Sequence, residues 1–212
     1  MTTIVILFQG AVKRQMSYRE RQAQLTKERV ALAARKLFRE RGYVATSIES
    51  VAKAAGVAVP TVYSAFGNKK AILEEVRRLW IQQAEVRELL AEALDEPDCR
   101  RRLDLAARWH SQQLERGHDV IKIFQEAARA DPSIRKVWSG MLQGRAREKQ
   151  KFTQAIADCL KSGLSVRKAT DIYVALETLE IYEELVIERG WTPADYQSWL
   201  AKTLREQLLA RP

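Results

Sequence analysis

The stretch that decides the fold is residues 46–66, which read TSIESVAKAAGVAVPTVYSAF. Apolar residues recur three and four positions apart on both sides of a break at Gly56, and this periodicity predicts two short helices. A glycine allows the left-handed backbone that a sharp turn needs, and the small Ala55 before it lets the helices approach closely. Pro60 stands near the start of the second helix, where a missing N–H costs nothing. The pattern predicts a helix-turn-helix, a motif that presents its second helix to the major groove of DNA.

An amphipathic helix is expected on each side of this motif. Before it, one apolar stripe recurs at helical spacing over residues 30–38, with Thr26 as the expected N-cap. Thr46 and Glu49 fit a capping box, in which a hydroxyl is followed three residues later by a carboxylate. Glu49 is therefore interpreted as a capping acid rather than a residue that reads bases. After the motif, a further helix is expected over residues 70–94.

The remainder of the chain also has helical periodicity, interrupted at glycines and prolines. The expected helices cover residues 98–116, 119–130, 133–162, 166–189 and 193–210. No segment alternates apolar and polar residues as a strand does. The predicted fold class is therefore all-α. It comprises an N-terminal three-helix helix-turn-helix DNA-binding domain over residues 23–72 and a C-terminal helical ligand-binding and dimerisation domain over residues 73–212.

The charge of the chain is concentrated in its first third. The whole sequence has 36 Lys and Arg against 27 Asp and Glu, a net charge of +9. Residues 1–70 hold 13 basic and 4 acidic side chains, so they account for the whole excess, and the remainder is balanced. A basic module joined to a neutral body predicts a polyanionic partner for the module and a different task for the body. The alternative is a basic face that is merely solvated.

The first residues do not follow this pattern. Residues 1–22 are expected to form a flexible N-terminal extension, in which an apolar patch without a periodic partner precedes a polar, basic stretch. Met16 is a hypothetical natural start, which an intact-mass measurement on protein made from its native locus would decide. Alternatively, the basic stretch is an arm that reaches into a DNA groove.

Composition argues against several classes of protein. The longest apolar runs have five residues, whereas a membrane span needs about 20, so a cytoplasmic location without membrane contact is expected. In a reducing compartment, Cys99 and Cys159 are expected to be free packing residues. Two Cys and two His cannot build a repeated zinc-finger pattern, and no metal or cofactor is expected. The chain also lacks a Gly-rich phosphate loop, an HExxH helix and a GxSxG elbow, which argues against an enzyme.

Three segments in register resemble the tetracycline-repressor (TetR) family of transcriptional regulators. They are residues 29–47 (RVALAARKLFRERGYVATS), 51–57 (VAKAAGV) and 61–73 (TVYSAFGNKKAIL). Residues 188–193 resemble the C-terminal helices of some members more weakly. The resemblance implies an all-helical homodimer that regulates transcription. Its C-terminal domain would bind a small effector and then release DNA.

The resemblance also implies roles for particular residues of this chain. Phosphate contacts would come from Thr46, Ser47, Tyr63 and Lys69, and contacts to base edges from Val59, Pro60, Thr61 and Ser64. Hydroxyls and a lysine are good phosphate partners, and apolar groups favour thymine methyls. A core position for Tyr63 and a merely solvated Lys69 are the alternatives. Ala58 and Ala65 stand where many relatives have Ser and His, so sequence preference would rest more on DNA shape and on the N-terminal arm.

The C-terminal body carries aromatic residues at helical spacing, which more often form a core than a pocket. The resemblance implies an effector cavity among the middle helices. Its expected lining residues are Trp109, Phe124, Trp138, Met141 and Tyr173, with Glu177 or Glu126 as a polar anchor. A buried acid would favour a cationic or hydroxyl-bearing ligand. His110 is interpreted as a packing or ligand-contact residue.

The last two expected helices each carry an apolar stripe. The stripes are Ile172, Leu176, Leu179 and Val186 on the first helix, and Tyr196, Trp199, Leu200, Thr203, Leu204 and Leu208 on the second. Two such helices from each subunit would build a two-fold four-helix bundle, although burial against their own chain is the alternative. A homodimer also fits DNA geometry, because two recognition helices about 34–36 Å apart read a palindrome.

These features together predict a sequence-specific DNA-binding transcriptional regulator. It would be a repressor that a small-molecule effector releases from a palindromic operator in double-stranded DNA. The alternatives are a helical adaptor that binds only protein, and an enzyme. Specific duplex binding by the purified chain would reject the adaptor.

Overall fold

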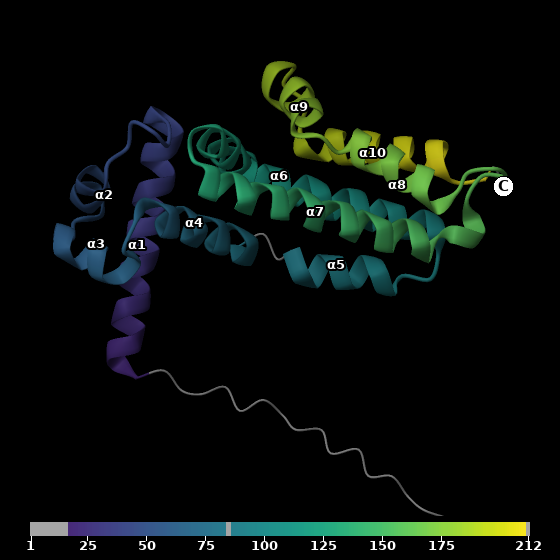
Figure 1. Ribbon diagram of the computed structural model, residues 1–212. Coiled ribbons are helices and arrows are strands. Elements are labelled where there is room, and N and C mark those ends of the chain that lie inside the picture. Colours follow the sequence, from purple (N-terminus) through teal and green to yellow (C-terminus); the bar gives the residue numbers. More distant parts are fainter. Residues whose placement is uncertain (1–16, 84–85, 211–212) are drawn as a thin grey trace, which may run out of the picture.

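The computed structural model describes residues 17–83 and 86–210, most of which form helices (Figure 1). The helices are α1 (Tyr18–Arg41), α2 (Ile48–Ala55), α3 (Val59–Phe66), α4 (Lys69–Gln83), α5 (Val86–Asp95), α6 (Cys99–Ala130), α7 (Pro132–Ala155), α8 (Val166–Leu176), α9 (Leu179–Tyr182) and α10 (Pro193–Leu208). A 3₁₀ turn covers Ala157–Cys159, and a π-helical turn covers Glu183–Glu188. The described part contains a single isolated β-bridge, so the predicted all-α class is confirmed. None of its helices has the length and apolar character needed to cross a membrane.

The first helix begins earlier than the sequence predicts. Ser17 caps α1 in a capping box, in which Glu20 N donates to Ser17 Oγ (3.2 Å) and Ser17 N donates to Glu20 Oε2 (2.8 Å). Thr26, the predicted N-cap, lies inside α1, where its hydroxyl donates to the Gln22 carbonyl. The prediction was wrong because it started from the buried stripe, whereas the cap precedes every buried residue of the helix. The predicted flexible extension therefore overlaps α1, and its first 16 residues, including the proposed start at Met16, lie outside the described residues.

The helix-turn-helix forms as predicted. Gly56 takes the left-handed conformation (φ 64°, ψ 39°) between α2 and α3. The Arg29 guanidinium of α1 donates to the carbonyls of Ala55 (3.0 Å) and Gly56 (3.2 Å), which fixes the turn. Val51 and Val62 are fully buried and hold α2 and α3 against α1. One face of α3 is thereby packed, and the opposite face points outward.

One long helix, α6, joins the two ends of the molecule (Figure 1). It is kinked at Gly117, where the sequence predicts a break between two helices. One buried core joins α1–α4 to the second half of α6, for example through Val120, and another joins its first half to α5 and α8–α10, for example through Leu103. The kink therefore lies between the two cores. The helix expected over residues 70–94 is likewise divided, into α4 and α5.

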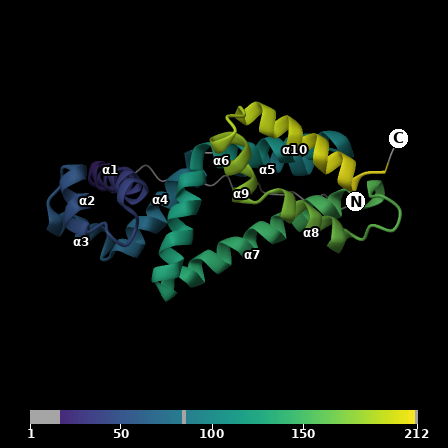
Figure 2. The same cartoon turned by 90° about the horizontal axis from the view of Figure 1, so that it is seen from above.

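The long helices expected after α6 are interrupted. Asp131 caps α7, which leaves the end of α6 and runs back along the body (Figure 2). The helix expected over residues 133–162 ends at Ala155, and the one expected over residues 166–189 divides into α8, α9 and the π-helical turn. Thr178 makes this second break by taking an extended conformation. Periodicity did not reveal it, because neither glycine nor proline stands there.

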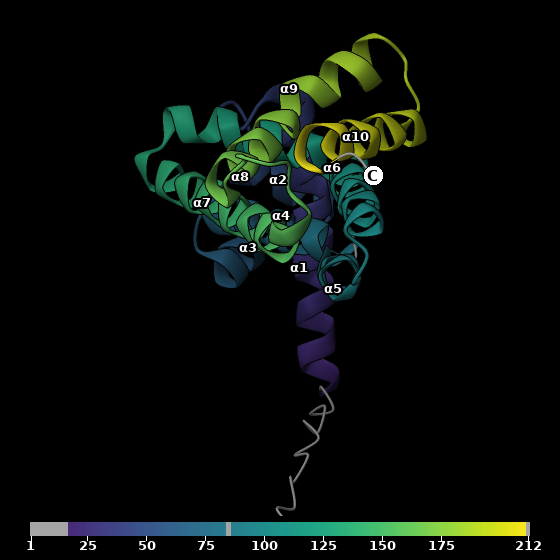
Figure 3. The same cartoon turned by 90° about the vertical axis from the view of Figure 1, so that its right-hand side faces the viewer.

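The last helix packs largely against its own chain. α10 contacts α6, and α7 lies along a different side of α6 (Figure 3). Four residues of the predicted partner stripe on α10 are fully buried in this way: Tyr196, Leu200, Leu204 and Leu208. For these four side chains burial within the chain is confirmed, and they are not available to a partner. The Trp199 and Thr203 side chains remain half-buried.

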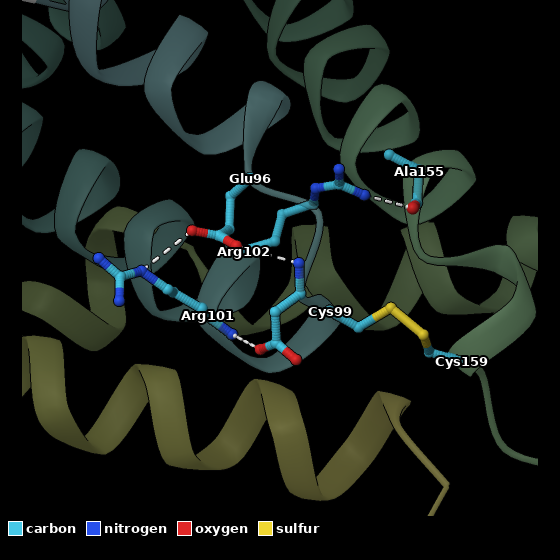
Figure 4. Close-up of a disulfide and its surroundings, with 7 residues drawn as sticks. Glu96, Cys99, Arg101, Arg102, Ala155 and Cys159 are labelled. Carbon is cyan, nitrogen blue, oxygen red and sulfur yellow. Dashed lines mark hydrogen bonds and ion pairs between the residues drawn. A yellow bond between two sulfur atoms is a disulfide. The ribbon is translucent and has the colours of Figure 1, made fainter.

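Cys99 and Cys159 are joined in a disulfide (Figure 4). Their Cα atoms are 6.6 Å apart, and the bond connects the start of α6 to the 3₁₀ turn that follows α7. Beside it, the Arg102 guanidinium donates to the Ala155 carbonyl and ties the same two segments. The expectation of free cysteines was wrong because it rested on their number and compartment. The packing of α7 against α6 brings the two residues within bonding range.

Candidate functional site

The outward face of α3 carries four of the predicted DNA-contact residues. These exposed residues are Pro60, Thr61, Tyr63 and Ser64. Tyr63 is 47% exposed to solvent, which excludes the alternative that it is a core aromatic. Val59, predicted to face a base, is half-buried and packs against the core of the α1–α4 end. The outer face of α3 therefore presents hydroxyls and apolar groups without a charged side chain.

The start of α2 is capped by Ser47 rather than Thr46. Ser50 N donates to Ser47 Oγ (3.2 Å), whereas Thr46 is buried and its hydroxyl donates to the Gly42 carbonyl (2.8 Å). The predicted capping box was wrong: Ser47, one position later, is the N-cap, and the residue three positions after it is Ser50 rather than an acid. The Thr46 hydroxyl faces the interior, so the phosphate contact expected from it is not supported. Ser47 is exposed and remains a candidate for that contact.

Glu49 lies at the start of α2 beside two exposed hydroxyls. Its carboxylate accepts hydrogen bonds from its own backbone N–H, from Ser47 and from Tyr63, and these hold its pKa below the ordinary value. The group is exposed and therefore ionised at neutral pH. It places a negative charge between two residues predicted to contact phosphate.

Lys69 is engaged within the protein. Its Nζ donates to the carbonyls of Tyr43 (2.8 Å), Val44 (3.2 Å) and Thr46 (2.9 Å), and it lies 4.4 Å from the centre of the Tyr43 ring. An ammonium has three N–H groups, so these carbonyls use all of them. Burial lowers the pKa of Lys69. The side chain ties the loop between α1 and α2 to the start of α4, and the predicted phosphate contact would require these bonds to break.

Two acids of α6 orient the α1–α4 end. Arg35 of α1 donates from Nε to Asp119 Oδ2 (2.8 Å), from Nη2 to Asp119 Oδ1 (2.6 Å), and from Nη2 to the Arg116 carbonyl (2.7 Å). Burial acts to raise the pKa of Asp119, but Arg35 holds it below the ordinary value. Glu126, expected as an alternative anchor of the cavity, instead accepts a hydrogen bond from the Tyr43 N–H at 3.0 Å. Its place is at the contact between the two ends of the molecule.

A cavity of about 750 Å³ opens among α4, α6, α7 and the junction of α8 with α9. Four of the predicted lining residues face it: Trp109, Trp138, Met141 and Glu177. Phe124 and Tyr173 do not line it. Phe124 belongs to the core that α6 shares with α1–α4, and Tyr173 packs on Phe152 in the core of the body. The helical periodicity predicted that these two rings are buried. It did not show whether a buried ring faces the cavity or the packed core.

Most of the charged residues that line the cavity were not predicted from the sequence. They include Arg77, Arg145, Glu148, Lys149 and Glu180. A helical signal was nevertheless present for two of them on α7. Residues 138, 141, 145, 149 and 152 follow one another at spacings of three and four, so Arg145 and Lys149 continue the stripe that contains Trp138 and Met141.

An ion pair is buried at the wall of the cavity. Lys149 Nζ lies 2.6 Å from Glu177 Oε2, and each residue is only 1% exposed. The ammonium also lies 3.9 Å from the centre of the Trp109 ring and 5.0 Å from that of Tyr173. His110 Nδ1 is 3.6 Å from the same carboxylate oxygen, and burial, together with the charge of Lys149, lowers the pKa of His110 well below its ordinary value. Glu177 is buried, as expected for a residue that anchors a ligand, but its negative charge is already neutralised by Lys149.

Trp80 of α4 contacts both α6 and the cavity. Its indole N–H donates to the Gln113 carbonyl at 3.1 Å, its ring packs beside Gly117, and it lines the cavity. The ring therefore contacts both the kink of α6 and the space where a ligand would lie.

The helix-turn-helix segment matches a known family. Residues 32–76 fit the family described as bacterial regulatory proteins, tetR family. A curated relative, the HTH-type transcriptional repressor KstR2 of Rhodococcus jostii (strain RHA1), is 25% identical over 122 residues. That alignment covers 50% of this chain and 58% of the relative, so the chain matches little more than half of that protein.

Solved structures share the fold of most of the chain. NalD, the secondary repressor of the MexAB-OprM multidrug efflux pump in Pseudomonas aeruginosa, has a TM-score of 0.69 at 24% identity, over 91% of this chain and 100% of that one. FadR of Bacillus subtilis, solved with stearoyl-CoA, has a TM-score of 0.67 at 22% identity, over 84% and 96%. A transcriptional regulator from Saccharomonospora viridis, solved with choline, has a TM-score of 0.67 at 19% identity, over 89% and 100%. Residues 32–76 of the chain therefore match the tetR family of bacterial regulatory proteins, and the chain shares the fold of these solved regulators.

Proposed function

We propose that the protein is a homodimeric transcriptional repressor that binds a palindromic operator and leaves it when a small molecule fills the cavity. One observation carries this proposal. The exposed face of α3 packs against no other part of the described chain and is free to contact DNA. The same chain has a cavity lined by Trp80, and Trp80 links α4 to α6. The tetR-family match over residues 32–76 supports the DNA-binding part.

Base recognition would rest on apolar contacts and hydroxyls. The Thr61 methyl and Pro60 favour thymine methyls, and the Ser64 hydroxyl both donates and accepts. Ser47 and Tyr63 would contact phosphates on either side. Because α3 has no Arg, Asn or Gln, it offers no bidentate contact to guanine or adenine, and half-sites rich in A·T pairs are expected.

Release would pass through α4 and α6. A ligand that displaces Trp80 also displaces α4, whose Lys69 holds the loop before α2 through the Thr46 carbonyl. Such a ligand must bind the released conformation more tightly than the DNA-bound one, because only differential binding shifts an equilibrium. Two solved neighbours contain choline and stearoyl-CoA. Choline is a cation and stearoyl-CoA is an anion, so the fold does not determine the charge of the ligand. The ligand of this chain therefore depends on the residues that line its own cavity.

The homodimer would use the outer faces of the last helices. Apolar residues of the predicted stripes that remain half-buried are Ile172, Leu176, Val186 and Trp199, and Ile187 beside them in the chain is 51% exposed. Two subunits joined there would set two copies of α3 on successive turns of one face of DNA. A regulator of chromosomal genes would work in the cytoplasm.

Selection of bound sites from random duplex DNA tests the proposal. An enriched palindrome is expected, bound with an affinity that falls steeply as salt rises through counterion release. Thr61→Ala should change the base preferred at one position of each half-site. Ser139→Ala, exposed on α7 and outside the cavity lining, is the control and should leave the preference unchanged. A chain that sediments as a monomer and enriches no sequence would contradict the proposal and favour a protein-binding adaptor.

A further inference from the structure

The walls of the cavity are mostly apolar. Three indole rings line it, those of Trp80, Trp109 and Trp138. Aliphatic and thioether side chains lie between them: Ile81, Leu90, Leu114, Ile121, Val137, Met141 and Leu179. A cavity of about 750 Å³ with such walls has the size and character of a site for a drug-sized molecule. The main body of a fitting ligand is therefore apolar.

The charged groups that line the cavity are not equally satisfied. Arg77 and Arg145 form no ion pair with any residue of the described ranges, and the Nε atom of each is buried without a hydrogen-bond partner there. Among the lining acids, the two oxygens of Glu177 are buried in the same way, but Lys149 Nζ lies 2.6 Å from one of them. Glu148 and Glu180 have no buried oxygen of this kind, and Glu180 is exposed. These acids keep their water, whereas the guanidinium groups have lost part of theirs. An anion would replace that lost hydration.

Two cations lie beside the buried carboxylate of Glu177. Burial is the main cause that lowers the pKa values of Lys149 and His110, and the charge of Arg145 lowers both further, so its guanidinium lies near them. His110 is neutral and adds no charge. Arg145 and Lys149 both act on the fully buried carboxylate of Glu177, whereas Glu148, the other acid that acts on Lys149, is only half-buried. A cationic ligand would add a third positive charge in a poorly hydrated place, whereas an anion would balance the set.

We infer that the cavity binds an amphipathic acid, with its apolar body among the three tryptophans and one carboxylate paired with Arg145. The inference rests on the proposed function and names the chemical class of its effector. Arg145 Nη2 already donates to the Val174 carbonyl at 2.8 Å, so the planar guanidinium is oriented before a ligand arrives. Its other N–H groups suit a carboxylate. The cationic ligand expected from a buried acid is disfavoured, because Lys149 neutralises Glu177.

A series of probes that differ only at one end tests the charge preference. Pyrenebutyrate, pyrenebutanol and pyrenebutylamine share the same apolar body, and pyrene accepts energy from nearby tryptophans. Titration of the full chain should show energy transfer with each probe that binds. The acid should bind at least about tenfold more tightly than the alcohol, as expected for a hydrogen-bonded charge, and the amine more weakly than the alcohol. Equal affinities for acid and alcohol, or tightest binding of the amine, would overturn the inference.

Two variants on α7 test the anchor. Arg145→Gln should abolish the preference for the acid while leaving the affinity for the alcohol within about twofold. Arg147→Gln is the matched control, because Arg147 is exposed on the same helix and does not line the cavity. Retention of the acid preference by R145Q would overturn the role of Arg145. Operator binding is measured separately on the same preparations. Acid binding without operator release therefore contradicts the proposed function alone, and release by other ligands with no acid preference contradicts this inference alone.

Discussion

The indole of Trp80 occupies the space in which a side chain at position 117 would begin. A Cβ placed on Gly117 would lie 1.9 Å from Trp80 Nε1, well inside any contact distance. The same indole donates its N–H to the Gln113 carbonyl and lines the cavity. Because Gly117 is also the kink of α6, one ring joins α4, the kink and the candidate effector site.

Replacing Gly117 by Ala should displace this ring. We expect the free energy of unfolding, measured by chemical denaturation, to fall by about 1–3 kcal/mol, the usual cost of overpacking. Operator affinity should fall as well, because α4 moves with Trp80. Gly140→Ala is the control, since nothing lies within 4 Å of a Cβ there, and it should be neutral or stabilise α7 by up to about 1 kcal/mol. If the two variants have equal free energies of unfolding, the position of the Trp80 ring does not depend on a glycine at position 117.

Replacing Asp119 by Asn removes the carboxylate that accepts two hydrogen bonds from Arg35. Bonds to charged groups contribute about 1.5–3 kcal/mol, and the free energy of unfolding at pH 7 should fall by about that amount. The pKa of Asp119 is lowered from 3.8 in the folded protein, so its contribution is present above that pH and is lost as pH falls through the folded value. The difference in stability between wild type and D119N should therefore shrink below about pH 4.

The pair of Lys122, which is exposed, and Glu183, which is half-buried, has its charged atoms 2.8 Å apart and supplies a control for this prediction. Glu183→Gln should cost no more than about 1 kcal/mol, as is usual for a pair at the surface. A larger loss of unfolding free energy in E183Q than in D119N would contradict the role of Asp119 in holding α1 against α6.

Replacing Lys69 by Met removes three hydrogen bonds that hold the loop before α2. We expect weaker operator binding together with an unchanged slope of log affinity against log salt, because the ammonium is used within the protein. Each lysine that does contact a phosphate adds about 0.9 to that slope. Lys202→Met, exposed on α10, should change neither quantity. A slope reduced by about one unit in K69M would restore the phosphate contact that the sequence predicts.

Removing the disulfide between Cys99 and Cys159 should lower the free energy of unfolding by about 2–4 kcal/mol, since the bond closes a loop with a sequence separation of 60 residues. The double variant C99S/C159S and the reduced wild type should unfold at the same denaturant concentration. Reductant should have no effect on the double variant. An oxidised wild type as unstable as the double variant would mean that the bond does not form.

The sequence by itself determined the helix-turn-helix and the all-α class. These follow from interactions between residues a few positions apart: the left-handed Gly56, Pro60 at the start of α3, and apolar stripes that repeat every three or four residues. The exposed face of α3 was predictable for the same reason, because Val62 had to face the core and Thr61 and Ser64 then face away from it. Charge counting added the contrast between a basic module and a neutral body.

Only the tertiary structure decided which polar groups are used inside the protein. Thr46 and Ser47 are chemically alike, and the packing of the loop after α1 turns the first inward and leaves the second outside. Lys69 donates to three carbonyls, and Lys149 forms an ion pair with Glu177, only because segments distant in sequence pack together. The helical period shows which face of a helix is apolar, but the partner across that face depends on how the helices cross. That is why the disulfide, the kink contact and the charge of the cavity could not be read from the sequence.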